Sequence, residues 1–164
     1  MIPEQAFSYC MNLTSVSLPE GIVYIGKNSF ENCVSLTSVI FPSTLACVDE
    51  NAFDRCIRLE TVVWFGTASQ WEKLSVNAGN RLILSAKKVQ PGDEITVSFD
   101  ANGGAGQMSG MNLTSGSAVV LPECGFTPPD GGTFQTWTVN GQKFAPGEEV
   151  ILHSDIVAVA LWDV

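Results

Sequence analysis

Basic residues are scarce in this sequence, and in its second half they are almost absent. Residues 90–164 hold nine acidic residues and one basic residue, Lys143, whereas residues 1–89 hold eight acidic and seven basic residues. The whole chain of 164 residues carries a formal net charge of −9. Such a surface repels phosphates, so we expect neither nucleic acid nor anionic lipid as a partner. The plain interpretation of the acidity is a well-solvated surface.

Long apolar runs are lacking as well. No stretch approaches the roughly 20 apolar residues that a helix needs to cross a bilayer, so we expect no direct membrane insertion in this segment. The first residues, Met-Ile-Pro-Glu, lack the basic region and the apolar core of a secretory signal peptide. The sequence also begins inside a repeat, described below. We expect further repeats before Met1, and the alternative is an open edge that pairs with a partner.

Residues for catalysis or metal binding are few. His153 is the single histidine, and the sequence has neither a Gly-x-Ser-x-Gly motif nor a phosphate-binding loop. Asp100 and Asn102 stand in a turn cluster without the ligand spacing of a calcium site. We therefore predict no enzyme activity, no cofactor and no metal. A hydrolase remains as a third hypothesis, which a pocket with two carboxylates, or His153 beside a nucleophile, would support.

A repeat organises the first half of the chain, in which like residues recur every 23 positions. Several columns keep this period without interruption, which is typical of stacked repeats. They are Phe7, Phe30 and Phe53; Cys10, Cys33 and Cys56; Leu13, Leu36 and Leu59; and Val16, Val39 and Val62. One short unit cannot bury an apolar face alone, so we expect stacked coils, each in contact only with its neighbours.

Each repeat carries a strand signal and a turn signal. The segment from Leu13 to Pro19 alternates apolar and polar residues, which predicts a short strand. Equivalent strands would lie parallel, about 4.8 Å apart. The Ala-Phe-x-x-Cys segment predicts a tight helical turn whose Phe is wedged into the core.

The five cysteines are an odd number, so they cannot all pair. Cys10, Cys33 and Cys56 would form a column whose side chains point the same way, a geometry that favours buried structural thiols over a disulfide. They lack C-x-x-C spacing, which argues against zinc. Whether Cys47 or Cys124 forms a disulfide stays open.

A closing cap is predicted after the third repeat. Thr67 followed by Gln70 is a capping box, which predicts that a short helix starts there. Trp71 and Leu74 would lie on one face of that helix and cover the open end of the stack, with Trp64 packed against them. Repeat arrays need such caps because the last coil otherwise exposes apolar surface and a strand edge.

The repeats resemble the leucine-rich repeats of BspA-like bacterial surface proteins. The matching segments are AFSYCMNLTSVSLPEGIVYIG, SFENCVSLTSVIFPSTLACVD and AFDRCIRLETVVWFG, together with the closing segment FGTASQWEKLSV. The resemblance covers about residues 2–89. It implies a short right-handed leucine-rich-repeat solenoid, with parallel strands and short helical turns. It also implies an extracellular or cell-surface location in a bacterium.

The second half begins after a linker at residues 90–94, so we expect a capped solenoid over residues 1–89 and a separate module over residues 95–164. Strands are predicted at Ile95 to Phe99, Val119 to Leu121, Glu149 to Leu152 and Ile156 to Trp162. The core is predicted to hold five aromatic residues, Phe99, Phe134, Trp137, Phe144 and Trp162.

The second half resembles the internalin-type B repeat, also called the Listeria–Bacteroides repeat. The matching segments are ITVSFDANGG, GSAVVLP, TFQTW, FAPG and the terminal ALW. The resemblance covers about residues 95–163 and implies a small β-grasp-like module of bacterial surface proteins. Gly132 and Val159 stand where that family tends to have Tyr.

The outward residues of the predicted solenoid strands are the candidate binding surface, because solenoids bind partners on such sheet faces. They are Ser15, Ser17, Ser38, Ile40, Thr61 and Val63. Over three strands the face would extend roughly 15 Å. We expect a non-catalytic adhesion or ligand-binding protein whose partner is a host or bacterial surface protein or a glycan. The alternatives are an ordinary exposed face and a purely structural stalk.

Overall fold

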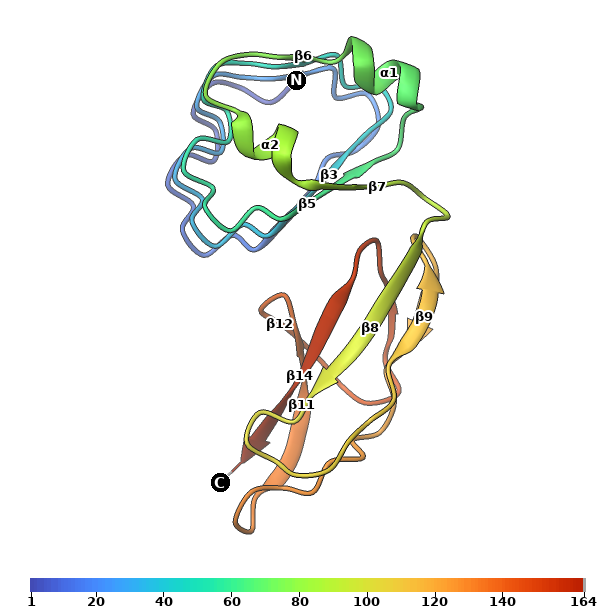
Figure 1. The fold of residues 1–164 in the computed structure, drawn as a ribbon. Helices are drawn as coiled ribbons and strands as arrows, with labels where there is room; N and C mark the ends of the chain where they lie inside the picture. Colours follow the sequence, from blue (N-terminus) through green and yellow to red (C-terminus); the bar gives the residue numbers. More distant parts are fainter. Residues whose placement is uncertain (164) are drawn as a thin grey trace. The chain divides into compact units, whose positions relative to one another are not determined.

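The computed structural model describes residues 1–163. The chain forms two compact units, Met1–Gln90 and a second one that starts at Pro91 (Figure 1). Each unit is described by itself below.

The first unit is a solenoid with two parallel sheets. One sheet has the order β1-β3-β5-β7, formed by β1 (Ser15–Ser17), β3 (Ser38–Phe41), β5 (Thr61–Trp64) and β7 (Lys87–Val89). The other has the order β2-β4-β6, formed by β2 (Tyr24–Ile25), β4 (Cys47–Val48) and β6 (Ser75–Val76). In Figure 1 successive coils follow nearly the same path through space. The predicted fold class, a β-rich chain with a leucine-rich-repeat solenoid, is confirmed.

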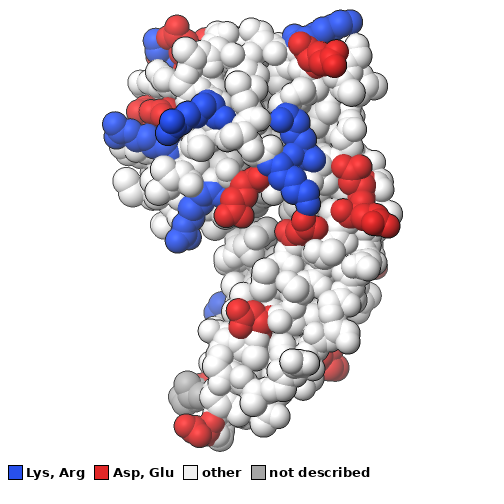
Figure 2. Space-filling model, viewed as in Figure 1, with Lys and Arg blue, Asp and Glu red and all other residues white. Residues whose placement is uncertain are grey.

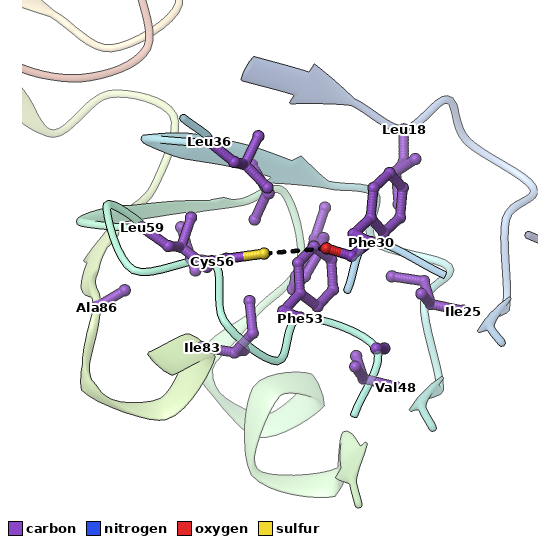
Figure 3. Packing of buried hydrophobic residues seen from close by; sticks show 14 of the residues in the cluster. Leu18, Ile25, Phe30, Leu36, Val48, Phe53, Cys56, Leu59, Ile83 and Ala86 are labelled. Atoms are coloured by element: carbon purple, nitrogen blue, oxygen red, sulfur yellow. Dashed lines mark hydrogen bonds between the residues drawn. The ribbon is translucent and has the colours of Figure 1, made fainter. Parts of the chain in front are cut away.

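Like side chains of successive coils stack in rows inside the solenoid (Figure 3). The Phe30 ring lies between two others, 5.1 Å from the Phe7 centroid and 5.0 Å from the Phe53 centroid, in stacked geometry. Phe30 and Phe53 are fully buried. Phe7 is 42% exposed because it belongs to the first coil and has a neighbour on one side only. The constant period of the sequence thus predicts which side chains stack in a row, and a residue of such a row meets solvent where its coil lies at the end of the stack.

The Ala-Phe-x-x-Cys segments form tight turns instead of the predicted helical turns. The Cys33 N–H donates to the Phe30 carbonyl at 3.2 Å, and the Cys56 N–H donates to the Phe53 carbonyl at 3.3 Å. Two residues after each Phe the backbone enters the left-handed region, at Asn32 (φ 58°) and Arg55 (φ 57°). A helix cannot continue through that conformation, so each segment stops after one turn.

The helix of the predicted cap is present, but it lies between the third and fourth coils and does not close the stack. Helix α1 (Ala68–Lys73) starts at a capping box, in which the Thr67 hydroxyl accepts from the Gln70 N–H at 3.2 Å and the Gln70 side chain accepts from the Thr67 N–H at 2.8 Å. Trp71 and Leu74 pack against the hydrophobic core. The Trp64 and Trp71 rings meet edge to face at 5.4 Å. The predicted helix start and the packing of Trp64 against Trp71 are confirmed, whereas the prediction that this helix covers the open end of the stack is wrong, because a fourth coil follows it.

A fourth coil follows this helix, and the sequence analysis did not predict it. It contains β6, helix α2 (Arg81–Ser85) and β7. Ser75 pairs with Cys47 and Lys87 pairs with Thr61, so these residues lie 28 and 26 positions after their partners instead of 23. The insertion of α1 lengthens the connection from β5 to β6, and the residues of the coil therefore fall outside the sequence columns. The buried Ile83 of α2 continues the core beside the third coil.

Asn80 completes the hydrogen-bond ladder at the end of the stack. In the inner coils the N–H of each Phe donates to a backbone carbonyl of the next coil, Phe7 to Ser29 at 2.7 Å and Phe30 to Ala52 at 2.8 Å. The Phe53 N–H instead donates to the Asn80 side-chain Oδ1 at 2.9 Å. The Asn80 Nδ2 donates back to the Asp49 carbonyl at 2.6 Å. The Asn80 side-chain amide therefore takes the place of the backbone carbonyl that accepts this bond in the earlier coils.

Replacing Asn80 by Ala is expected to lower the free energy of unfolding of the first unit by about 1–3 kcal/mol, because it leaves the buried Phe53 N–H without an acceptor. Urea unfolding followed by circular dichroism measures the change. Ser85→Ala on the exposed side of α2 is the matched control, with an expected change within about 0.5 kcal/mol. Equal stability of the two variants would contradict the role of Asn80.

The second unit contains one five-stranded and one two-stranded sheet. The larger sheet has the order β12-β11-β14-β8-β9, formed by β8 (Glu94–Asp100), β9 (Met111–Thr114), β11 (Thr133–Val139), β12 (Gln142–Phe144) and β14 (Ile156–Asp163). The smaller one pairs β10 (Ala118–Val120) with β13 (Glu149–Ile151), antiparallel. β8 and β14 pair in parallel, whereas the other neighbours are antiparallel. The four predicted strands are confirmed, and β9, β11 and β12 are additional.

Trp137 is the centre of the core of the second unit. It is fully buried, and its indole N–H donates to the Pro122 carbonyl at 2.8 Å. Three phenylalanine rings surround it, at centroid distances of 5.1 Å for Phe99, 5.0 Å for Phe134 and 6.3 Å for Phe126. Phe126 was not among the predicted core residues. The predicted residues Phe99, Phe134, Phe144 and Trp162 are half-buried, because they lie at the margins of this cluster.

Candidate functional site

The outward face of the β1-β3-β5-β7 sheet carries all six residues of the predicted binding surface. Strand register aligns them in two columns. One column is Ser15, Ser38 and Thr61, and the other is Ser17, Ile40 and Val63. β7 extends the first column by Lys87 and the second by Val89. The fourth strand adds about 4.8 Å to the face that three strands would provide.

The exposure of the second column falls from Ser17 toward Val89, whereas the first column is exposed at both of its ends, Ser15 and Lys87. Ser38, Ile40 and Thr61 between them are half-buried. The described part of the face that meets solvent therefore has several hydroxyl groups, one aliphatic side chain, Ile40, and one cation, Lys87. Hydroxyl groups can donate and accept hydrogen bonds, which suits contact with peptide groups or with sugar hydroxyls.

Val63 does not belong to the exposed face. It is 1% exposed, and its register partner Val89 is also 1% exposed. Val63 is not part of the hydrophobic core cluster of the solenoid, which holds its neighbours Val62 and Trp64. The candidate surface that meets solvent is therefore reduced to the other five predicted residues.

A second polar surface accompanies the β2-β4-β6 sheet, and sequence reasoning missed it. Asp49 is its hub, since it accepts hydrogen bonds from the Tyr24 hydroxyl and, at 2.9 Å, from the Asn77 side chain. Lys27 and Glu50 form an ion pair beside it, with Nζ and Oε2 2.9 Å apart. The column of Gly26, Asp49 and Asn77 mixes residue types, so it gives no periodic signal in the sequence. The network ties neighbouring coils together.

This network shifts the pKa values of Tyr24 and Asp49. The hydrogen bond with Asp49 raises the pKa of Tyr24 to about 12. The same bond, with that from Asn77, lowers the pKa of the Asp49 carboxyl. A lowered carboxyl pKa means that the ionised Asp49 stabilises the fold above the ordinary Asp pKa, and this stabilisation is lost as the pH falls through the lowered value. A raised phenol pKa means that the protonated Tyr24 stabilises the fold below about pH 10, and this stabilisation is lost as the pH rises toward 12.

Tyr24→Phe is therefore expected to lower stability near neutral pH and to weaken both pH dependences. Its stability should fall less than that of the natural chain on acidification, and less between pH 10 and 12. Urea midpoints measured across the pH range test this. Tyr9→Phe is the control, because Tyr9 is 59% exposed in the first coil. Identical pH profiles for the natural chain and Tyr24→Phe would contradict the account.

The cysteines are free thiols throughout the described residues. Cys33 and Cys56 are buried in one row, where each thiol donates to the carbonyl of the preceding coil's Phe at 3.2 Å. Burial raises the pKa of Cys56 to about 12 and raises that of Cys33. Cys10 is exposed because it lies in the first coil. The two inner thiols are thus protonated and act as small packing groups. Cys47 and Cys124 are free and half-buried.

The residues considered for catalysis or metal binding make the following contacts. The Ser115 hydroxyl donates to the backbone carbonyl of His153 at 3.0 Å. Burial lowers the pKa of His153. Asp100 accepts from the Asn102 N–H at 2.7 Å, which is a turn contact. Among residues 1–163, His, Cys, Asp and Glu side chains form no cluster of three that could hold a metal ion.

Within the described residues, helices are short, and none has the length and hydropathy needed to cross a bilayer.

Comparison with known proteins gives a match for the first unit. No curated protein and no solved structure is significantly similar to the chain. Repeats of the BspA-like kind are associated with bacterial cell-surface proteins. Residues 1–76 match the family described as BspA type leucine rich repeat region (6 copies), which confirms the predicted resemblance for this part of the chain.

Proposed function

We propose that this chain is a non-catalytic part of a bacterial surface or secreted protein, and that the outward face of its β1-β3-β5-β7 sheet binds a protein or a glycan. The observation that carries the proposal is the alignment of Ser15 with Ser38 and of Ser17 with Ile40 on neighbouring strands. These aligned residues place hydroxyl groups and one aliphatic group on a single rigid surface.

Rigidity supports this assignment. The strands that present the face are held from behind by fully buried residues, among them Val39 and Phe41 of β3. A partner that meets side chains on such a scaffold loses little binding free energy to ordering of the protein. The match of residues 1–76 to surface-protein repeats supports an extracellular or cell-surface location.

We also propose that the second unit is an internalin-type B-repeat module. Its support is the position of the resembling pieces on the strands. ITVSFD lies on β8, AVV on β10, TFQTW on β11 and ALW on β14. In this proposal the module is a second binding element or a spacer.

A purely structural stalk is the competing function. The burial of Val63 favours it, because part of the outward face is not open to a partner. The two functions predict different results for the isolated chain, since a stalk has no saturable partner of its own.

The test is equilibrium binding of the purified chain to a panel of host extracellular-matrix proteins, bacterial surface proteins and glycans. For a partner found in this way, Ser17→Arg is expected to weaken binding about tenfold or more, because it places a long cation on the most exposed part of the second column. Ser75→Arg, an equally exposed serine on β6, is the matched control and should change affinity less than twofold, roughly the range of a neutral contact.

Three results would reject the sheet-face proposal. They are equal effects of the two variants, no effect of Ser17→Arg, and no saturable binding to any member of the panel. The last result would favour the stalk.

A further inference from the structure

The second unit has an open hollow where β8 ends. Its volume is about 400 Å³, and its lining includes Phe99, Asp100, Gln107, Met108, Phe126 and Val157. β9 pairs with β8 only over Glu94 to Val97, so the last residues of β8 are not covered by that strand. All lining residues of the hollow belong to the second unit, whereas the outward face of the solenoid belongs to the first.

The apolar wall of the hollow is fixed in place by the core. Phe99 and Phe126 both pack on the buried Trp137, at 5.1 and 6.3 Å between ring centroids. The Met108 sulfur accepts a hydrogen bond from the Gly125 N–H at 3.2 Å. Val157 is 50% exposed. A ligand therefore meets preformed aromatic and aliphatic surface.

The polar side of the hollow is negative. The Asp100 carboxylate is exposed, and its Oδ1 accepts from the Asn102 N–H at 2.7 Å, which orients the group and leaves Oδ2 for a ligand. The Gln107 side chain, also exposed, adds an amide oxygen that can accept a further bond. None of the described lining residues is basic.

The charge of the whole unit acts in the same direction. Residues 91–164 hold nine acidic residues and one basic residue, Lys143. Figure 2 shows acidic side chains scattered over the second unit, while most basic groups on this face lie on the first. A cation that approaches the hollow is attracted both by the nearby carboxylate and by the field of the unit.

We propose that this hollow binds an arginine side chain of a partner protein. A guanidinium is planar, so it can lie against an aromatic ring, and its N–H groups can donate to the Asp100 carboxylate and the Gln107 amide oxygen together. Lysine offers a compact, strongly hydrated charge that fits an aromatic wall less well. This site is independent of the sheet face proposed above, and either can exist without the other.

The test is a titration of the full ¹⁵N-labelled chain with the peptide acetyl-Gly-Arg-Gly-amide, followed by NMR. Saturable shifts are expected for the amide signals of Gly106, Gln107 and Met108, with weak affinity because the hollow is open and the ligand small. The same peptide with citrulline in place of arginine keeps the shape and loses the charge. It should bind at least about three- to fivefold more weakly, the factor that one partly exposed charge pair provides. A lysine peptide should also bind more weakly than the arginine peptide.

Two variants separate the site from the general acidity of the unit. Asp100→Asn keeps an acceptor for the Asn102 N–H and removes the charge, so it should weaken arginine binding about three- to fivefold. Glu149→Gln removes the same charge from β13, outside the lining, and should have an effect below about 1.5-fold at physiological salt. Equal effects of the two variants, binding of citrulline or lysine as strong as that of arginine, or shifts that do not saturate would each overturn the proposal.

Discussion

Replacing Phe30 by Ala is expected to lower the free energy of unfolding of the first unit by about 3–5 kcal/mol. Phe30 is fully buried and stacks between Phe7 and Phe53, at 5.1 and 5.0 Å between centroids. Its loss leaves a cavity inside the row, and both neighbouring rings lose a stacking partner. A coil with such a cavity also weakens its two interfaces, because solenoid stability resides in contacts between neighbours.

Urea unfolding followed by the indole N–H signals of Trp64 and Trp71 measures this change in the first unit. Phe7→Ala is the matched control, since Phe7 occupies the same row but is 42% exposed and stacks on one side only. We expect the control to lose clearly less, about 1 kcal/mol. Equal losses for both variants would mean that the rows do not carry the stability of the solenoid.

Trp137→Ala is expected to destabilise the second unit by about 3–5 kcal/mol as well. Three phenylalanine rings lie against its buried indole, so its removal opens the centre of the core. The Pro122 carbonyl would also lose its donor. A loss of this size is comparable with the total stability of a small domain, so the unit would be close to unfolding.

The indole signal of Trp162 reports the second unit during urea unfolding of the Trp137 variants. Trp137→Phe keeps an aromatic ring but removes the bond to Pro122 and part of the ring volume, so it should lose less than the alanine variant, about 1–3 kcal/mol. The Trp64 and Trp71 signals should keep their midpoint if the two units unfold separately. A Trp137→Ala chain with an unchanged Trp162 midpoint would contradict the description of this core.

Three coils of the first unit were predictable because their residues repeat at one constant interval. The register of Val16 with Val39 and of Val39 with Val62 is the same as the sequence columns. The fourth coil was missed because helix α1 lengthens the connection that precedes it. Val62 pairs with Lys88, whereas the constant interval would place Ser85 beside it. A search that allows an insertion after Trp64 would find this coil.

The candidate site contains one error. Five of the six predicted residues meet solvent at least in part, and Val63 is buried. An alternating pattern shows which side of a strand a residue faces. It does not show what covers that side, and Val89, the register partner of Val63 on the missed strand β7, is buried as well.

In the second unit, two of the three missed strands, β9 and β12, have weak signals, whereas Thr133–Val139 (β11) is rich in β-branched and aromatic residues. Met111–Thr114 has one β-branched residue, Thr114, and two apolar side chains, Met111 and Leu113. Gln142–Phe144 has three residues, too few for an alternating pattern. Such strands form because the neighbouring strands supply the hydrogen-bond partners, which is a tertiary effect. The hollow at the end of β8 was unpredictable for the same reason, because its lining comes from separate segments.

Stacking of the coils in register is the central claim, since the outward columns of the sheet exist only if the coils align. Methyl NOESY spectra of the full chain test it most directly. The account predicts contacts of the Val39 methyl groups with those of both Val16 and Val62. Val39 methyl groups that contact neither residue, in a folded chain, would contradict it.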